Sequence, residues 1–456
     1  MKVQRVEKHI IKQNNEYYSI LDDFCFKSKN LYNYANYKVR QCFIILSKLS
    51  EGKEISYQEL EFVNTLNSKV DDYNNKRLEK YKKDLEKGKK VKEPKLYKYF
   101  NIDNKYINYE FNDFICKGYD YSNMPVAQSA QQCLRLLEKN WKSFFKSIKD
   151  WTNHKNKYLG RPKPPKYLKK DGRNILILTN NNCKIKNGYI NFPKSFNGFR
   201  LNTNCDNLQQ VRILPRNKHM VIEIVYNTDI HELKEDNSKY VGIDIGLDNF
   251  ATLTNNCGVK PVIISGRKLK SANKYYNKQM SYYRKIAKRM NNLDYTNRMN
   301  KLTIKRNNMI TDLIHKASKS VINYALSCGV NTIVIGNNKD WKRNSSMSKK
   351  VNQSFIGVPH QMLINQIKYK AENVGLNVVV TEESYTSGTS FLDNEDPIKE
   401  NYNKSRRIYR GLFKSNLGKL INADVNGSLQ IIKKVFPNAF SYGIEDCGYN
   451  PIRVGL

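Results

Sequence analysis

The sequence lacks long apolar runs. No stretch of the 456 residues approaches the roughly 20 apolar residues that span a bilayer, and no apolar segment follows the charged start MKVQRVEKHI. These absences argue against a membrane-spanning protein and against a cleaved secretory signal. We therefore expect a cytoplasmic protein without a membrane partner.

Closely spaced cysteines are also missing. The nine cysteines are scattered along the chain, and no two of them form a C-x-x-C pair. Secreted disulfide scaffolds are dense in cysteine, and structural zinc sites use closely spaced pairs. The pattern predicts free, mostly buried thiols in a reducing compartment.

Acidic residues are scarce relative to basic ones. Lysine and arginine total 79 against 42 aspartates and glutamates, which gives a net charge of +37. The abundance of Asn, Tyr and Ile indicates that nucleotide bias contributes to the lysine content. Bias alone does not explain why acidic residues are so much fewer than basic ones. We therefore expect a polyanionic partner, and we favour RNA or DNA over a membrane surface.

The hydrophobic pattern divides the chain into regions. One strand at the start precedes a mainly helical stretch, and short strand candidates follow the Gly- and Pro-rich segment YLGRPKPPKY. From Tyr240 the pattern predicts three strands joined by short turns, a basic helical hairpin over roughly 268–328, and then strand–helix–strand steps. This order is typical of an RNase H-like α/β fold.

Three acidic residues lie at the ends of apolar elements of this second half. Asp244 is in YVGIDIGLDNFATLT, Glu383 follows NVVVT, and Asp424 is in LINADVNGSLQII. Around Asp244 the residues alternate, so its carboxylate points away from the aliphatic side of the strand and toward the side of the glycines. A cluster of carboxylates is what a pair of Mg²⁺ ions needs for phosphodiester hydrolysis. A lone acid in a strand more often faces solvent, but three such acids favour a metal site.

These motifs resemble those of the TnpB proteins of bacterial insertion sequences, the OrfB type, which are RNA-guided DNA endonucleases related to type V CRISPR effectors. The resemblance is strongest over residues 240–432, where VGIDIGLDNFATLT, YTSG and NADVNGSLQI match three family motifs in order. It is weaker in MPVAQSAQQCLRLLEKNWKSFF and GRPKPPKY. The resemblance implies that Asp244, Glu383 and Asp424 are the catalytic residues and that they hold two Mg²⁺ ions.

One departure from the family concerns the second catalytic acid. Most members carry it straight after the strand that here reads TIVIGNN, but Gly336 occupies that place. In Fanzor proteins and their bacterial relatives the glutamate has moved to the next strand, the position of Glu383 here. We expect both strands to lie beside the strand of Asp244. Glu382 would point to the opposite side, which makes it the weaker candidate.

The other departure concerns the zinc ribbon that the family carries between its last two motifs. Ser390 and Asp393 stand where the first cysteine pair would be, and no cysteine lies between 328 and 447. We expect no zinc, and an insert held instead by aromatic packing. The residues expected to pack there are Phe391, Tyr409 and Phe413. Arg406, Arg407 and Arg410 either contact nucleic-acid phosphates or form an exposed basic turn, and both interpretations remain open.

The resemblance implies an α/β fold in which an RNase H-like RuvC nuclease domain in the C-terminal half follows a helical recognition lobe and a small β-barrel wedge domain. The expected boundaries are a first wedge strand over 1–15, the recognition lobe over 16–155, the wedge barrel over 156–237, the first part of the nuclease over 238–383, a target-binding insert over 384–420, and the last part of the nuclease over 421–456.

The implied function is cleavage of DNA that is complementary to a bound guide RNA, next to a short flanking motif. Guide RNA and target DNA are the expected partners of a protein that is a monomer or, alternatively, a dimer. A nuclease-inactive RNA-guided repressor is one alternative, which Gly336 supports. A conventional RNase H-like transposase or resolvase is another, but it does not explain the N-terminal lobe.

Overall fold

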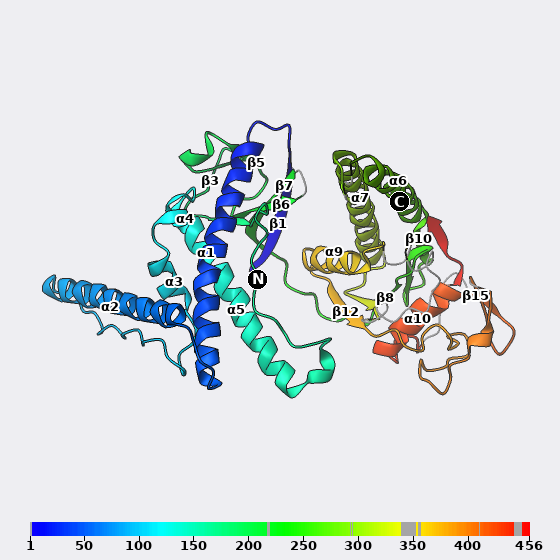
Figure 1. Cartoon of the computed structure of the whole chain (residues 1–456). Helices are drawn as coiled ribbons and strands as arrows, with labels where there is room; N and C mark the ends of the chain where they lie inside the picture. Colours follow the sequence, from blue (N-terminus) through cyan, green and yellow to red (C-terminus); the bar gives the residue numbers. More distant parts are fainter. Residues whose placement is uncertain are drawn as a thin grey trace. The chain divides into compact units, whose positions relative to one another are not determined.

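The computed structural model describes residues 2–216, 219–291, 293, 295–338, 353, 357–409, 411–441 and 449–456. The chain divides into two compact units, one made of Val3–Thr228 and the other of Asp229–Leu456 together with the first residues (Figure 1). Among the described residues, no helix is long and apolar enough to cross a membrane. The mixed α/β class predicted from the sequence is confirmed.

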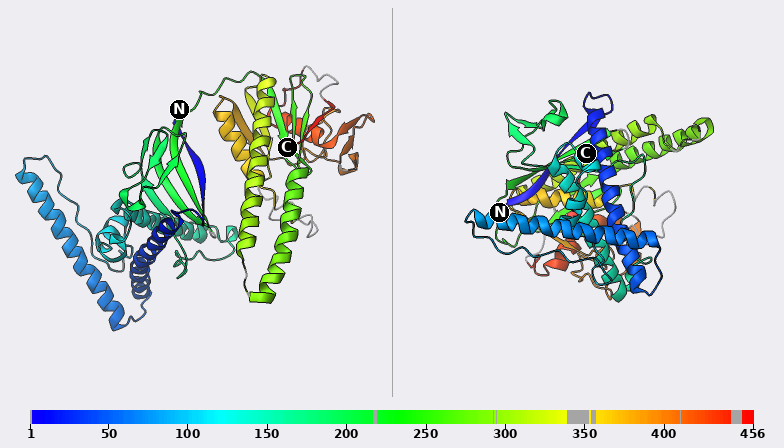
Figure 2. Two further views of the ribbon diagram at one scale, coloured as in Figure 1. Left: turned by 90° about the horizontal axis from the view of Figure 1, so that it is seen from above. Right: turned by 60° about the vertical axis from the view of Figure 1, so that its left-hand side comes forward.

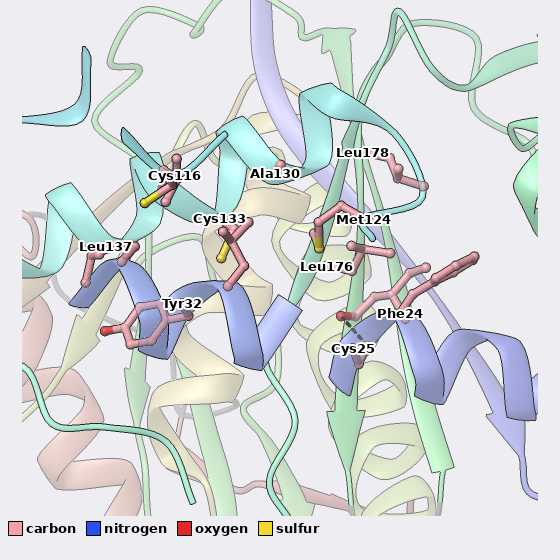
Figure 3. Close-up of a cluster of buried hydrophobic side chains, with 14 of the residues drawn as sticks. Phe24, Cys25, Tyr32, Cys116, Met124, Ala130, Cys133, Leu137, Leu176 and Leu178 are labelled. Carbon is pink, nitrogen blue, oxygen red and sulfur yellow. Dashed lines mark hydrogen bonds between the residues drawn. The ribbon is translucent and has the colours of Figure 1, made fainter. Parts of the chain in front are cut away.

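The first unit is built around two long helices. The apolar side of α5 packs against α1, and Trp141 of α5 donates a hydrogen bond from Nε1 to Oδ1 of Asn36 in α1, at 3.0 Å. Buried thiols, including Cys133 of α5 and Cys116 at the end of α3, lie among the apolar side chains of this unit's core (Figure 3). All the cysteines in the described part of the chain are free, as predicted. The helices are α1 (Tyr18–Ser50), α2 (Tyr57–Glu86), α3 (Tyr109–Ile115), α4 (Tyr119–Ser122) and α5 (Ala127–Asn153), with short 3₁₀ turns at Lys155–Lys157 and Lys194–Phe196.

The strands of this unit form two sheets. A four-stranded sheet has the order β1-β7-β6-β2, so the first strand of the chain returns beside β7 as the sequence suggested. A three-stranded sheet contains β3, β4 and β5, and its first hairpin turns at Asn187 and Gly188, both with positive φ. The strands are β1 (Lys2–Lys12), β2 (Leu176–Thr179), β3 (Lys184–Lys186), β4 (Tyr189–Asn191), β5 (Arg200–Asn202), β6 (Leu208–Arg216) and β7 (His219–Asp229).

The second unit contains a six-stranded sheet of order β12-β11-β8-β9-β10-β16. Strands β8, β9 and β10 are antiparallel neighbours, whereas β11 runs parallel to β8, β12 parallel to β11, and β16 parallel to β10. The C-terminal ends of β8, β10, β11, β12 and β16 therefore lie at one edge of the sheet. The strands are β8 (Tyr240–Asp244), β9 (Asn249–Asn255), β10 (Val262–Ser265), β11 (Thr332–Gly336), β12 (Asn377–Thr381) and β16 (Ile452–Val454).

Helices cover both faces of this sheet. On one face, the aliphatic side chains of β8 join a core with α7 and α9. On the other face, α10 crosses β8 so closely that a Cβ at Gly242 would lie 2.5 Å from the carbonyl oxygen of Ser428 (Figure 1). Helices α6 and α7 lie side by side as the predicted hairpin (Figure 2). The helices are α6 (Arg267–Asn291), α7 (Asn297–Ser327), α9 (His360–Glu372) and α10 (Ala423–Val435).

A small sheet lies in the insert that precedes α10. Its three strands pair in the order β13-β14-β15, and Phe413 of β14 is fully buried in a cluster with side chains of α10. The strands are β13 (Arg407–Tyr409), β14 (Leu412–Lys414) and β15 (Leu420–Asn422), and a 3₁₀ turn at Lys404–Arg406 comes before them. The insert is thus packed on the same helix that carries Asp424.

Candidate functional site

The three predicted acids meet where strand ends of the sheet face the start of α10. Asp244 is the last residue of β8, Glu383 follows the end of β12, and Asp424 lies in the first turn of α10. Burial raises the pKa of Asp244 well above its usual value, and the negative charges of Asp424 and Glu383 raise it further. Asp424 and Glu383 are thus close enough to Asp244 to interact with it electrostatically.

Asp244 points toward α10, as the alternation in its strand predicts. Its neighbours Val241, Ile243 and Ile245 belong to the core on the opposite face of the sheet. A Cβ added at Gly427 of α10 would lie 3.1 Å from Oδ2 of Asp244. The glycine therefore leaves room above this carboxylate, which a side chain at that position would crowd.

Asp424 is held by the start of its helix and by two neighbouring side chains. The side-chain oxygen of Asn422 caps α10 by accepting hydrogen bonds from the backbone N–H groups of Asp424 and Val425, at 3.0 and 3.2 Å. Asn249 Nδ2 donates to Oδ2 of Asp424 at 2.5 Å, and Arg407 lies 3.6 Å from Oδ1. The carboxylate is therefore oriented from two sides.

Asn249 is the site residue that the sequence reasoning missed. It stands at the start of β9, five positions after Asp244 in the motif IDIGLDNFATLT. A polar residue at the first position of a buried strand is a weak signal, because such a side chain often only ends a turn. Its contact with Asp424 depends on an element 175 positions away in sequence.

The strand that leads to Glu383 lies further out than expected. Of these two strands, β11 pairs with β8, whereas β12 pairs with the far side of β11, so the expectation that both strands adjoin β8 is wrong for β12. Thr381, the last residue of β12, pairs with Gly336 at the end of β11. Glu383 must therefore reach across the position of Gly336 to interact with Asp244.

The absence of a side chain at Gly336 makes this reach possible. A Cβ there would lie 3.2 Å from Oε2 of Glu383 and 2.5 Å from Cδ1 of Ile431. Glu383 thus lies over the strand end where most family members carry their acid. Glu382 is exposed, whereas Glu383 is partly buried. Strand β12 ends at Thr381, before both glutamates, and Glu383 is the less exposed of the two.

Burial also changes the pKa of Glu383. It raises the pKa of this carboxyl from 4.5 to about 7, and the nearby Lys434 ammonium offsets part of that rise. Lys434 itself is held by Ser384, whose backbone oxygen and hydroxyl accept hydrogen bonds from its Nζ at 2.9 Å each. An ionised Glu383 is therefore unfavourable in the metal-free protein.

The raised pKa predicts a pH-dependent stability. A buried acid whose folded pKa lies above its unfolded value costs stability as pH rises from about 4.5 to about 7. At pH 8 in a chelating buffer, Glu383→Gln should therefore raise the free energy of unfolding by up to about 3.5 kcal/mol, since each unit of pKa shift corresponds to about 1.4 kcal/mol. At pH 5 the gain should be small. Denaturant unfolding at both pH values measures it.

Glu382→Gln is the matched control, because this exposed neighbour should leave stability nearly unchanged at either pH. A loss of stability in Glu383→Gln at pH 8, or a gain that is larger at pH 5, would contradict the assigned burial of the carboxyl.

The donor chemistry of the site fits a hard divalent cation. Carboxylate oxygens are the ligands that Mg²⁺ prefers. Oε2 of Glu383 is buried and has no hydrogen-bond partner among the described residues, which leaves an acceptor that a cation would satisfy. Within the described ranges, no three or more His, Cys, Asp and Glu side chains are already arranged as a metal site.

The insert is organised by a network of hydrogen bonds around Glu395. This carboxylate lies 2.5 Å from Arg406, and both side chains are only 16% exposed. Its Oε2 also accepts a hydrogen bond from the backbone N–H of Ser390 at 2.8 Å, while its Oε1 accepts one from Asn416 at 3.2 Å. Asp393 accepts a hydrogen bond from the backbone N–H of Asn416 at 2.7 Å. Ser390 and Asp393, at the positions of the family's first cysteine pair, thus belong to this network.

The structure separates the three arginines of the insert. Arg406 is committed to Glu395, Arg407 lies beside Asp424, and Arg410 lies outside the described residues. The expected aromatic packing holds for Phe413, which is buried, and for Phe391, whose ring centroid lies 4.7 Å from that of Phe440. It is wrong for Tyr409, which is 65% exposed because β13 turns that side chain outward.

The network predicts that Glu395 stabilises the insert. Glu395→Gln removes the charge opposite Arg406 and leaves a largely buried guanidinium without its ionic partner, which should cost about 1–3 kcal/mol. Thermal unfolding and limited proteolysis of the insert should both register the loss. Asp396→Asn is the control, since its side chain is 66% exposed and its ion pair with Lys433 should contribute little. Equal effects of the two changes would refute the proposed importance of Glu395.

Two family models match the second half of the chain. The model OrfB_IS605, described as a probable transposase, matches residues 223–342, and the Cas12f1-like TNB domain model matches residues 360–431. The two matches include all three acids, the hairpin of α6 and α7, and the insert. The second half of the chain is thus similar to the OrfB_IS605 transposases and to the TNB domain of Cas12f1-like proteins. A comparison with curated proteins finds no match.

Solved structures of low similarity include RNA-guided effectors. A Cas12f1–sgRNA–target DNA complex is 15% identical, with a TM-score of 0.33 over 94% of this chain and 98% of the other. A CRISPR–Cas12f ternary complex is 15% identical, with a TM-score of 0.34 over 84% and 83%. The mini-RNA-guided endonuclease Cas_phi3 is 10% identical, with a TM-score of 0.32 over 49% and 57%.

Proposed function

We propose that this protein is a TnpB-like, RNA-guided DNA endonuclease that cuts target DNA complementary to a bound guide RNA, next to a short flanking motif. The observation that carries the proposal is the proximity of Glu383 and Asp424 to Asp244, whose pKa is raised by burial first and then by the charges of those two residues. Perturbed carboxylates that gather at strand ends are typical of catalytic sites.

The proposal assigns the parts of the chain as follows. Residues 16–155 form the recognition lobe, and the strands of 1–15 and 156–237 form the wedge domain. Residues 238–383 and 421–456 form an RNase H-like RuvC nuclease, because three antiparallel strands followed by parallel β11 and β12 have the strand order of that fold. The insert over 384–420 contacts the target.

The three acids would hold two Mg²⁺ ions, which supply an activated water and stabilise the leaving 3′ oxygen. The chain itself does the positioning. Asn249 and Arg407 orient the Asp424 carboxylate, and the Asn422 cap holds the helix turn from which it projects. Lys434 lies near Glu383 and favours its ionised form. Gly336 and Gly427 leave the space that the carboxylates need.

The guide and target account for the charge of the chain. A net charge of +37 requires a large polyanion, and a guide RNA paired with its target supplies one. In RNA-guided recognition, base pairing reads the sequence, while the protein reads the shape of the heteroduplex and the flanking motif. The Cas12f1 structure of similar length is likewise described as a complex with sgRNA and target DNA.

The repressor alternative loses its main support in this site. Gly336 suggested a missing acid, but Glu383 lies over that glycine and interacts with Asp244. The proposed site therefore has three carboxylates rather than two. Cleavage explains this arrangement, whereas binding alone does not require it.

Sequencing of the RNA that copurifies with the protein tests the proposal. A guide should appear as one abundant species with a constant part and a variable end, protected from added ribonuclease. A broad mixture of cellular RNA without common ends would contradict the guided mechanism and favour a conventional transposase or resolvase.

A further inference from the structure

A cavity of about 500 Å³ opens beside Asp424. Besides Asp424 and Asn249, it is lined by three arginines from separate parts of the chain. Arg267 is the first residue of α6, Arg407 is the first residue of β13, and Arg453 lies in β16 near the C-terminus. The cavity thus adjoins the acid cluster but carries the opposite charge.

The topology of the sheet explains why these arginines meet. Strand β16 runs parallel to β10 with Arg453 opposite Ile263, so its end lies at the same sheet edge as Asp244. Helix α6 starts directly after β10, at a turn where the backbone N–H of Gly266 donates to the carbonyl of Asp248 at 2.8 Å. This contact fixes the first residue of α6 beside the turn between β8 and β9.

The charges in the cavity do not cancel. Asp248, one of the two acids in its wall, forms an ion pair with Lys270. The other, Asp424, lies 3.6 Å from Arg407. Neither Arg267 nor Arg453 has an ion-pair partner among the described residues, and both side chains are exposed. Two guanidinium groups are therefore available to an incoming anion.

We propose that Arg267 and Arg453 bind a backbone phosphate of the DNA strand being cut, next to the phosphate that reaches the acids. The inference rests on the proposed function. Guanidinium groups form paired hydrogen bonds to phosphate oxygens, which positions a strand without reading its sequence. Because Asn249 and Asp424 belong both to the cavity and to the acid site, its occupant is the strand in the site rather than the distant guide.

The role assigned to the arginines is positioning. A phosphate held in the cavity fixes the strand on the side of Asp424, so the scissile group cannot slide along the acid cluster. The C-terminal strand β16 thereby acquires a function, since it carries Arg453 to the cavity edge.

A chemical double-mutant cycle tests the proposal. Guide-loaded protein carrying Asp244→Ala, which cannot cut, is titrated with target DNA in which single phosphates near the cut are replaced by neutral methylphosphonates. One position should weaken binding by about fivefold to tenfold, the size expected for an exposed charged contact. Arg453→Gln and Arg267→Gln should each weaken binding of the unmodified strand and abolish most of the effect of that one substitution.

Lys278→Gln provides the matched control. Lys278 is exposed on α6 and lies outside the cavity, and its replacement by Gln removes the same single charge. The loss of affinity caused by Lys278→Gln should add to the loss caused by each methylphosphonate, whatever its position in the strand. If the losses of affinity from Arg453→Gln and Arg267→Gln also simply added to those from the methylphosphonates, the proposal would be wrong. Both arginines would then attract DNA only through their general positive charge.

The cycle separates this inference from the proposed function. Suppose that one phosphate is coupled to the two arginines but the unmodified protein never cuts DNA. The phosphate site would then stand, and the proposed nuclease activity would be wrong. Guided cutting by the unmodified protein without any coupling would retain the nuclease and refute the phosphate site.

Discussion

Asp244→Ala and Asp424→Ala should each lower DNA cleavage by about a thousandfold or more, while guide and target binding stay nearly unchanged. The two acids lie at the end of β8 and the start of α10, where their charges repel each other. Carboxylates that repel each other in this way would bind a cation and do not stabilise the fold. Removing one of them should therefore abolish catalysis and leave the fold intact. Single-turnover cleavage of a matched target, alongside binding of the same target, measures both effects.

A surface acid provides the control for these two variants. Asp312 pairs with Lys316 on α7 and is 59% exposed, so Asp312→Ala should leave cleavage unchanged. Cleavage within tenfold of the unmodified protein for either Asp244→Ala or Asp424→Ala would remove that residue from the proposed site.

Glu383→Gln should lower the cleavage rate by at least about a hundredfold, whereas Glu382→Gln should change it by less than about threefold. Only Glu383 points toward Asp244, and the amide that replaces it is a neutral and weaker metal ligand. A single-turnover comparison of the two variants measures the difference. If Glu382 proved essential and Glu383 dispensable, the register assigned to β12 would be wrong.

Gly336 offers a second test of the same residue. A Cβ at this position would lie 3.2 Å from Oε2 of Glu383, so a glutamate there starts within reach of the same space. Adding Gly336→Glu to Glu383→Gln should recover part of the lost activity, although Ile431 must shift to admit the new side chain. Gly336→Ala added to Glu383→Gln is the control and should recover none.

Two of the three proposed acids have a local signal in the sequence. Alternation in β8 gives the direction of Asp244, and Asn422 before an amphipathic run gives the start of α10 with Asp424 in its first turn. Such signals depend on residues a few positions apart. They therefore survive without knowledge of the tertiary structure.

The parts that could not be predicted depend on pairings over long distances. Strand β16 is three residues long and carries no pattern that joins it to β10. The order of β11 and β12 depends on parallel pairing, which leaves no mark on either strand alone. Arg406 had a charge but no visible partner, because Glu395 comes close only once the insert has folded on α10.

Guided cleavage with exchanged guides tests whether the bound RNA directs the cut. The purified protein is loaded with either of two guide RNAs that differ only in their variable ends, and each complex is offered both matching DNA targets in Mg²⁺. We expect each complex to cut only the target that matches its own guide. Complexes of the Asp244→Ala variant should bind the same target without cutting it. Cutting that ignores the guide, or matched binding without any cutting by the unmodified protein, would contradict the proposed function.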